Sequence, residues 1–245
     1  ADLPAAAEIF ERHIEAIGGQ DAIDALQNRR ITGTYSGVPF DYTARLQVWW
    51  ERDGRYHQKV IEPGGLRYQL YANNGRTWMQ IMDNEPAPIL GSRHVEMMDT
   101  SDFLGEANYA ERYKSMKTAA KAKADGMDVW VVQAITQLGR PHTLFFSVES
   151  GILQGTRVPV TSENGIREMT VKLYDYVDAG GVLYPSRIVQ QFAGDTAKNE
   201  FRYTKIEVNA EDEHDYSVPA EIEQVFVELE QQAESGEAPA PASDG

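Results

Sequence analysis

The sequence predicts a mainly β fold of the α+β class, with N-terminal helices lying on one long antiparallel sheet of about ten strands. Three observations support this. Helical periodicity opens the chain, alternation with a period of two begins at Arg29, and short turns join the alternating segments. Successive strands are not separated by helices in the manner of β–α–β units, so a parallel sheet is not expected.

The first helix is predicted from a single apolar stripe. Phe10, Ile14 and Ile17 recur at helical intervals, and charged residues occupy the other side. Gly18-Gly19 can adopt the left-handed conformation that ends a helix. Residues 22–26 carry a shorter apolar edge, which indicates a second helix that must pack on the rest of the protein to be stable.

The strands are predicted from alternation between turn signals such as Asp53-Gly54. Pro86 and Pro88 exclude a central strand between residues 85 and 111. Within that stretch, residues 94–104 are expected to form one or two helical turns. Strands are expected at residues 29–35, 43–51, 56–61, 66–70, 77–82, near 113, and at 129–136, 143–148, 152–160, 167–177, 184–192 and 199–208.

The chain is expected to contain one domain and a C-terminal extension. Residues 1–219 form the domain, and residues 220–233 form a short amphipathic helix whose apolar residues include Ile222 and Phe226. Residues 234–245 consist mainly of Glu, Ala, Pro, Ser and Gly, a composition that cannot bury a core and predicts disorder.

Composition excludes several classes of function. The net charge of −15 over 245 residues argues against nucleic-acid binding and against electrostatic binding to anionic membranes. Cysteine is absent, which rules out disulfides and thiol chemistry, and no apolar run is long enough to span a bilayer. The start, Ala-Asp-Leu-Pro-Ala, suits a mature terminus left by signal-peptide cleavage, or a point at which the sequence was cut.

Catalytic and metal-binding signatures are absent from the sequence. It contains no nucleophile elbow, phosphate-binding loop or zinc-protease motif, and no histidine pair has metal-ligand spacing. His13 flanks the apolar stripe of the first helix and is expected to be structural. The acidic run at 211–215 lacks the ligand order of a calcium loop and is expected to be a solvated turn. We therefore expect no catalytic residue, no metal, no cofactor and no enzymatic activity.

Aromatic and methionine residues are concentrated in the early strands, and some strands are apolar on both faces, as at Trp49-Trp50. Such a sheet must be covered twice or must face a cavity, and both alternatives remain open at this stage. A one-residue error in register would exchange the two faces. The residues predicted to line a ligand cavity are Phe10, Ile14, Ile17, Leu46, Val48, Trp50, Tyr68, Leu70, Trp78, Met79, Ile81, Met98, Phe103, Leu144 and Phe146.

Several motifs, in order, resemble one known family. They are IEAIGG with ALQNRRITGTY near the start, NNGRTW at 73–78, LFFSVESGILQGTRV at 144–158, YDYVDAGGVLYPSRIV at 174–189, and the closing FRYTKIEVNAEDEHDYSVP. Together they resemble the LolA/LolB-like periplasmic lipoprotein carriers, in the outer membrane lipoprotein-sorting branch of that superfamily. The C-terminal helix departs from the family pattern.

The resemblance implies a curved antiparallel half-barrel with helices over its concave face and an apolar cavity that receives acyl chains. It also implies a periplasmic location in a Gram-negative type of envelope and a lid arginine, for which Arg29, Arg30 and Arg93 are the candidates. The expected function is a carrier that shields lipid or lipoprotein acyl chains on the way to the outer membrane, with a transport partner at the inner or outer membrane. The alternative is a cell-envelope interaction or scaffold module whose core is filled by its own side chains.

Overall fold

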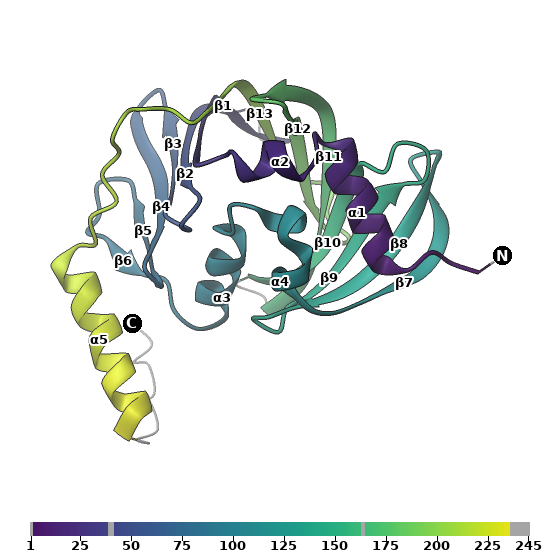
Figure 1. Ribbon diagram of the computed structural model, residues 1–245. Coiled ribbons are helices and arrows are strands. Elements are labelled where there is room, and N and C mark those ends of the chain that lie inside the picture. Colours follow the sequence, from purple (N-terminus) through teal and green to yellow (C-terminus); the bar gives the residue numbers. More distant parts are fainter. Residues whose placement is uncertain (1, 39–41, 163–164, 236–245) are drawn as a thin grey trace.

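The computed structural model describes residues 2–38, 42–162 and 165–235, and in them one antiparallel sheet of 13 strands forms the body of the protein (Figure 1). The mainly β prediction is confirmed. The strands are β1 (Asn28–Val38), β2 (Tyr42–Glu51), β3 (Tyr56–Glu62), β4 (Gly65–Asn73), β5 (Arg76–Ile81), β6 (Ala87–Pro88), β7 (Tyr113–Ala124), β8 (Met127–Thr136), β9 (Pro141–Ser147), β10 (Leu153–Ser162), β11 (Gly165–Ala179), β12 (Val182–Phe192) and β13 (Lys198–Val208).

The sheet consists of two meanders joined in the middle. Its order is β6-β5-β4-β3-β2-β1-β13-β12-β11-β10-β9-β8-β7, so every neighbouring pair except β1 and β13 is consecutive in sequence. The twelve segments expected as strands are all present, and the thirteenth strand, β6, forms at residues where prolines exclude a central strand. β6 lies at the edge of the sheet, where a residue without an N–H is tolerated.

A bulge bends the sheet where the two meanders join. The register between β1 and β13 shifts between Thr32 and Gly33, and a β-carbon on Gly33 would lie 2.0 Å from the carbonyl oxygen of Arg202. Only glycine permits this backbone approach. Bulges increase strand twist and bending, so this position contributes to the curvature that opens a space on one side of the sheet.

Helices occupy the concave side of the curved sheet (Figure 1). They are α1 (Ala6–Ala16), α2 (Gln20–Asp24), α3 (Gly91–Thr100), the 3₁₀ helix η1 (Gly105–Asn108) and α4 (Tyr109–Arg112). The two N-terminal helices are those predicted from the apolar stripe and the double glycine. The ten-residue α3 is longer than the one or two turns expected, and it contacts both β5 and β10, so it bridges the two wings of the sheet.

The first helix is packed against one wing of the sheet. Phe10 is fully buried, stacks on Tyr109 with ring centroids 4.9 Å apart, and meets Phe146 edge-to-face at 5.1 Å. Aromatic pairs of this kind add about 0.5–1.5 kcal/mol beyond their area burial. The space between α1 and this wing of the sheet is therefore filled by packed side chains.

A fifth helix, α5 (Ala220–Ser235), lies outside the sheet at the β5–β6 edge (Figure 1). Ile222 and Phe226 pack on Trp78, and Arg76 pairs with Glu223 at 2.9 Å. The predicted C-terminal helix is thus present, and it ends at 235 instead of 233. Disorder was predicted for residues 234–245. Residues 234 and 235 belong to α5, and the others lie outside the described part of the chain. None of the helices within 2–38, 42–162 and 165–235 has the length and apolar character that crossing a bilayer needs.

Candidate functional site

Two adjoining cavities lie between the helices and the concave face of the sheet. The smaller has a volume of about 290 Å³ and the larger about 690 Å³. Both are lined by Arg29, Trp50, Phe103, Leu104 and Glu106, which therefore form the boundary between them. Ligand sites in proteins typically measure roughly 300–1,000 Å³, so the two together have the size of a binding site for a small molecule.

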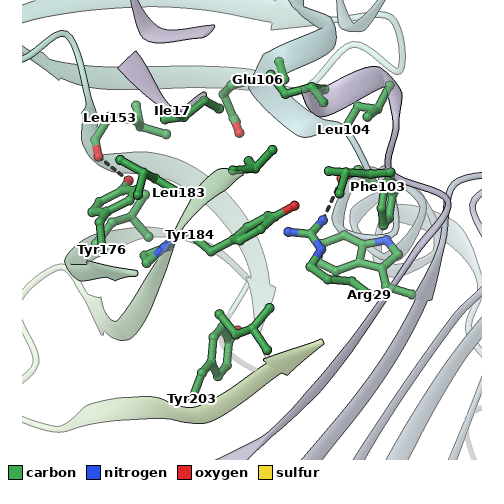
Figure 2. Close-up of a pocket in the computed structure, with 18 of the residues that line it drawn as sticks. Ile17, Arg29, Phe103, Leu104, Glu106, Leu153, Tyr176, Leu183, Tyr184 and Tyr203 are labelled. Carbon is green, nitrogen blue, oxygen red and sulfur yellow. Dashed lines mark hydrogen bonds between the residues drawn. The ribbon is translucent and has the colours of Figure 1, made fainter. Parts of the chain in front are cut away.

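The smaller cavity is mainly apolar (Figure 2). Its floor comes from the middle of the sheet, where β1 pairs with β13, and its roof from α1, α2 and the segment around η1. The apolar side chains that line it are Ile17, Ile23, Leu26, Ile31, Trp50, Phe103, Leu104, Ala107, Leu153, Leu173, Val182, Leu183, Pro185, Ile188 and Ile206. The space can therefore remove a hydrocarbon group from water.

Arg29 brings a cation to the boundary of the two cavities. It shares the inward face of β1 with Ile31, which is 4% exposed, because side chains two apart on a strand point the same way. Its neighbour Arg30 points to the other face, where it pairs with Glu51 at 2.8 Å and with Asp212 at 3.7 Å. Two adjacent arginines thus lie on opposite faces of the sheet, one at the cavities and one paired with carboxylates.

Three aromatic rings enclose the Arg29 guanidinium. Its central carbon lies 4.6 Å from the ring centre of Trp50, 4.7 Å from that of Phe103 and 4.5 Å from that of Tyr184. Burial lowers the pKa of Arg29 below its ordinary value. Among the described residues, no carboxylate lies within 4 Å of this guanidinium, and its Nε has no hydrogen-bond partner. Arg29 is therefore a cation held mainly by π faces.

Arg29 and Trp50 also fasten the segment that follows α3. Arg29 Nη2 donates a hydrogen bond of 2.8 Å to the carbonyl oxygen of Phe103, drawn in Figure 2, and Trp50 Nε1 donates one of 2.8 Å to that of Ser101. Backbone carbonyls at the end of a helix lack partners within the helix. Two inward side chains from β1 and β2 supply them here, so the segment is tied to the sheet at two points.

Three tyrosines from the last strands lie around the smaller cavity. Tyr176 donates a hydrogen bond to the carbonyl oxygen of Leu153 at 2.5 Å. Tyr184 points toward Arg29 (Figure 2), is 8% exposed, and has a hydroxyl without a partner among the described residues. Burial raises the pKa of Tyr184 and raises that of Tyr203 to about 12. All of these phenols are neutral hydrogen-bond donors at physiological pH.

The larger cavity has a more polar wall. One part of that wall is a buried cluster around Asp99 on α3, which accepts hydrogen bonds from Arg112 at 3.1 Å and His142 at 3.0 Å and pairs with Arg140. Burial alone would raise the pKa of Asp99, but the His142 hydrogen bond and the two arginines together lower it. The cluster fixes the end of α3 to α4 and to the β8–β9 turn.

His13 lies on the wall of the smaller cavity. It is 5% exposed and its Nδ1 accepts a hydrogen bond of 3.3 Å from the backbone N–H of Leu153. Burial lowers its pKa to about 4, so it is neutral. No group of three His, Cys, Asp or Glu residues in the part of the chain that the structure describes is arranged to hold a metal ion.

Some residues predicted to line a cavity do so. Ile17, Trp50 and Phe103 line the smaller one, and Trp50, Tyr68, Leu70, Met79 and Phe103 line the larger one. Others lie elsewhere on or near the concave side. Phe10, Leu144 and Phe146 are in the core beneath α1, Leu46 and Val48 are in a second core, Ile14 packs against a third, and Met98 is half-buried on α3.

The remaining two residues of that prediction lie outside both cavities. Trp78 precedes Met79 on β5, so the two side chains point to opposite faces. Met79 lines the larger cavity, whereas Trp78 packs under α5 on the outer face. Ile81 is 45% exposed near the sheet edge.

The prediction missed the charged and phenolic part of the site. Arg29, Tyr184 and Tyr203 were not among the predicted lining residues, although Arg29 was one of three candidates for a lid arginine. A signal for Arg29 exists in the sequence, because it has the same parity on β1 as the apolar Ile31 and Tyr35. No comparable signal identifies Tyr184 and Tyr203, because the pairing of β1 with β13 is not local.

Comparison with known proteins identifies the fold. No family model matches the chain, and a search of curated proteins finds no match. A LolA superfamily protein from Nitrosomonas europaea has a TM-score of 0.57 at 14% identity, with 90% of this chain and 97% of that chain covered. A domain described as an outer membrane lipoprotein-sorting protein domain, from Vibrio parahaemolyticus, has a TM-score of 0.58 at 12% identity, covering 84% and 93%.

A third solved structure is similar to this chain in fold. A DUF1329 family protein from Desulfovibrio piger has a TM-score of 0.59 at 9% identity, with 84% of this chain and 94% of that chain covered. At such identities the likeness concerns the fold and carries no residue roles. The resemblance seen in the sequence motifs is thereby confirmed in three dimensions: the chain has the fold of the LolA superfamily.

Proposed function

We propose that this protein is a carrier that shields acyl chains of a lipid or lipoprotein in the two cavities between the helices and the sheet. The observation that supports this most directly is the mainly apolar smaller cavity, which adjoins the larger one across a short boundary. The LolA-like fold supports the same proposal. A non-enzymatic role follows from it, because shielding needs no reactive group.

The driving force for binding is the removal of hydrocarbon from water. Each buried methylene contributes about 0.8 kcal/mol, so ten of them contribute about 8 kcal/mol. Association and ordering cost about 4 kcal/mol or more. A single acyl chain of moderate length therefore binds reversibly, which suits a carrier that must also release its cargo.

Release would require the segment between β6 and β7 to move. That segment contains α3, η1 and α4, and it is tied to the sheet by the Arg29 and Trp50 hydrogen bonds, by the Asp99 cluster and by hydrogen bonds of α3 to Thr77 and Thr161. We propose that the segment acts as a lid whose opening breaks these bonds. We propose that the carrier works in the periplasm of a Gram-negative type of envelope, with a partner at the inner or outer membrane that loads or unloads it.

Blocking the smaller cavity tests the proposal. Ile206→Trp introduces a large side chain at its wall, and Ile166→Trp is the matched control, since Ile166 is 74% exposed and lies outside both cavities. We expect native mass spectrometry of the protein purified from its host to show bound lipid. We also expect Ile206→Trp to bind a fluorescent fatty acid at least about tenfold more weakly than the control.

Two results would argue for the scaffold alternative. These are the absence of lipid in the purified protein, and equal behaviour of the two tryptophan variants toward the fluorescent fatty acid. In that case α5, which packs on the outer face through Ile222 and Phe226, would be the first surface to test for a protein partner.

A further inference from the structure

The charge of Arg29 is not neutralised within the site. Among the described residues, its guanidinium donates one hydrogen bond, to the uncharged carbonyl oxygen of Phe103, and its Nε is buried without a partner. A guanidinium has five N–H donors in a planar fork. A buried charge is normally paired with an opposite charge, so the arrangement lacks an anion.

Neighbouring acidic groups do not supply that anion. Glu106 is the acidic side chain that lines the smaller cavity, and it accepts a hydrogen bond of 3.3 Å from the hydroxyl of Tyr113. On the larger cavity, Asp99 and Asp102 pair with Arg112. Glu96, which also lines the larger cavity, accepts hydrogen bonds from Thr161. Each of these carboxylates thus has another partner, and none of them pairs with Arg29 among the described residues.

A second buried donor points to the same place. The hydroxyl of Tyr184 has no partner among the described residues although the side chain is 8% exposed. Its ring centre lies 4.5 Å from the central carbon of the Arg29 guanidinium, and Figure 2 shows its hydroxyl end directed toward Arg29. Two unsatisfied donors, one charged and one neutral, thus lie together at the edge of an apolar cavity.

We propose that Arg29 and Tyr184 bind the anionic headgroup, a carboxylate or a phosphate, of an amphiphile whose hydrocarbon tail lies in the adjoining cavity. This rests on the proposed carrier function and adds the class of ligand to it. An arginine fork matches carboxylate and phosphate oxygens, and hydrogen bonds between charged groups are about twice as strong as neutral ones. The aromatic rings around the guanidinium hold it in place for that contact.

Burial of the hydrocarbon tail makes this site selective for an amphiphile over a free anion. With a formal net charge of −15, the outer surface repels small anions, so affinity for an anion must come from the cavity itself. A free anion such as phosphate gains only the polar contacts, whereas an amphiphile gains the burial of its tail as well. We therefore expect the headgroup to be recognised as part of a lipid.

The test compares ligands that share a tail and differ in the headgroup. Delipidated protein is titrated by calorimetry with dodecanoate, dodecyl phosphate and dodecan-1-ol, and separately with acetate and inorganic phosphate. We expect the two anionic amphiphiles to bind at least about tenfold more tightly than the alcohol, a difference of about 1.4 kcal/mol. We expect acetate and inorganic phosphate to bind far more weakly than either amphiphile.

Variants assign the preference to the two residues. Arg29→Met should weaken dodecanoate binding by about 10- to 100-fold and change dodecan-1-ol binding by less than about threefold. Tyr184→Phe should reduce the preference in part. Arg187→Met is the control, because it removes the same charge from β12 at a residue that pairs with Glu200 and lines neither cavity. Arg29→Lys keeps the charge and should keep part of the preference, which separates headgroup binding from misfolding.

The outcomes distinguish this inference from the proposed function. If dodecan-1-ol binds the wild type as tightly as dodecanoate, or if Arg29→Met leaves the preference intact, the headgroup site is wrong while the carrier proposal stands. If none of the amphiphiles binds, the carrier proposal itself is wrong. If acetate or phosphate binds as tightly as the amphiphiles, the site recognises a free anion and not a lipid headgroup.

Discussion

Lowering the pH from 7 to 5 is expected to destabilise the fold through two buried neutral histidines. His57 is 4% exposed and His13 is 5% exposed. Burial lowers the pKa of His57 to about 3, with the nearby His214 adding to the shift, and burial lowers the pKa of His13 to about 4. Each group binds a proton much more readily in the unfolded chain than in the folded one.

The hydrogen bonds of His57 show why the folded state excludes the proton. Its Nε2 lies 3.2 Å from the Oε1 of Gln69, an acceptor, so that nitrogen carries the hydrogen. Its Nδ1, 2.8 Å from the Nε2 of His214, must then accept. Protonating Nδ1 would force His214 to move its own hydrogen from Nε2 to Nδ1, beneath Trp49, whose ring stacks on both histidines.

The size of the effect follows from the two pKa values. With 6.5 for the unfolded chain, the unfolded state binds more protons between pH 6.5 and the folded pKa, so stability is complete above 6.5 and falls as the pH falls. At pH 5 each histidine costs about 2 kcal/mol relative to pH 7, and the two together about 4 kcal/mol. The lowered pKa of Asp99 acts only below 3.8 and lies outside this window.

Urea denaturation at pH 7, 6 and 5 measures this loss. His57→Gln and His13→Gln should each lose about 2 kcal/mol less than the wild type over that range. His94 and His214, whose pKa values burial also lowers, act in the same direction and remain in both variants. If the variants lose as much stability as the wild type between pH 7 and pH 5, burial of neutral histidine is not the cause of the acid sensitivity.

Three further substitutions test the scaffold. Asp99→Ala leaves Arg140 without a carboxylate and Arg112 with Asp102 alone, and it should lower the free energy of unfolding in urea by about 3–5 kcal/mol; an unchanged midpoint would contradict this. In Gly18→Ala the β-carbon would lie 2.1 Å from a carbonyl oxygen of the β11–β12 turn at a φ of +133°, so calorimetry should show a larger loss than for Gly19→Ala, where no atom lies within 4 Å. Phe226→Ala removes the contact of α5 with Trp78 and should make α5 sensitive to protease while the circular dichroism of the sheet persists.

Local patterns in the sequence were sufficient to predict most of the helices and strands. The stripe containing Phe10 and the stop at Gly18-Gly19 predicted α1 and its end, and turn signals such as Asp53-Gly54 predicted the hairpins. Gly18 does more than end the helix, because its backbone packs against the turn at Gly181, and the N–H of Leu183 bonds to the carbonyl oxygen of Ile17 at 2.8 Å. The sequence did not predict this contact, since a glycine that permits close packing and one that only ends a helix look alike in sequence.

The site was harder to predict because it depends on pairing between distant strands. Alternation assigns side chains to two faces of a strand, but it does not say which face is concave or which strand lies beside β1. The strand beside β1 is β13, with Arg29 paired to Val208 and Tyr35 paired to Phe201. This pairing places Tyr203 of β13 in the lining of the same cavity as Trp50. These contacts join residues far apart in the chain, so no local sequence pattern predicts them.

The two adjacent arginines connect the stability of the fold to its proposed cargo. Arg30 has carboxylate partners and contributes to folding as an ordinary ion pair, whereas Arg29 is buried among rings without one. An unpaired buried cation destabilises the empty protein, and an anionic ligand that pairs with it removes that penalty only when bound. At 100 times its Kd, the ligand should stabilise the wild type by about 2.7 kcal/mol. At the same ligand concentration this gain should fall to about 0.4–1.4 kcal/mol in Arg29→Met, whose Kd is expected to be about 10- to 100-fold higher. The empty form of Arg29→Met should be no less stable than the empty wild type. If the proposed function is right, the protein is more stable with its anionic ligand bound than when it is empty.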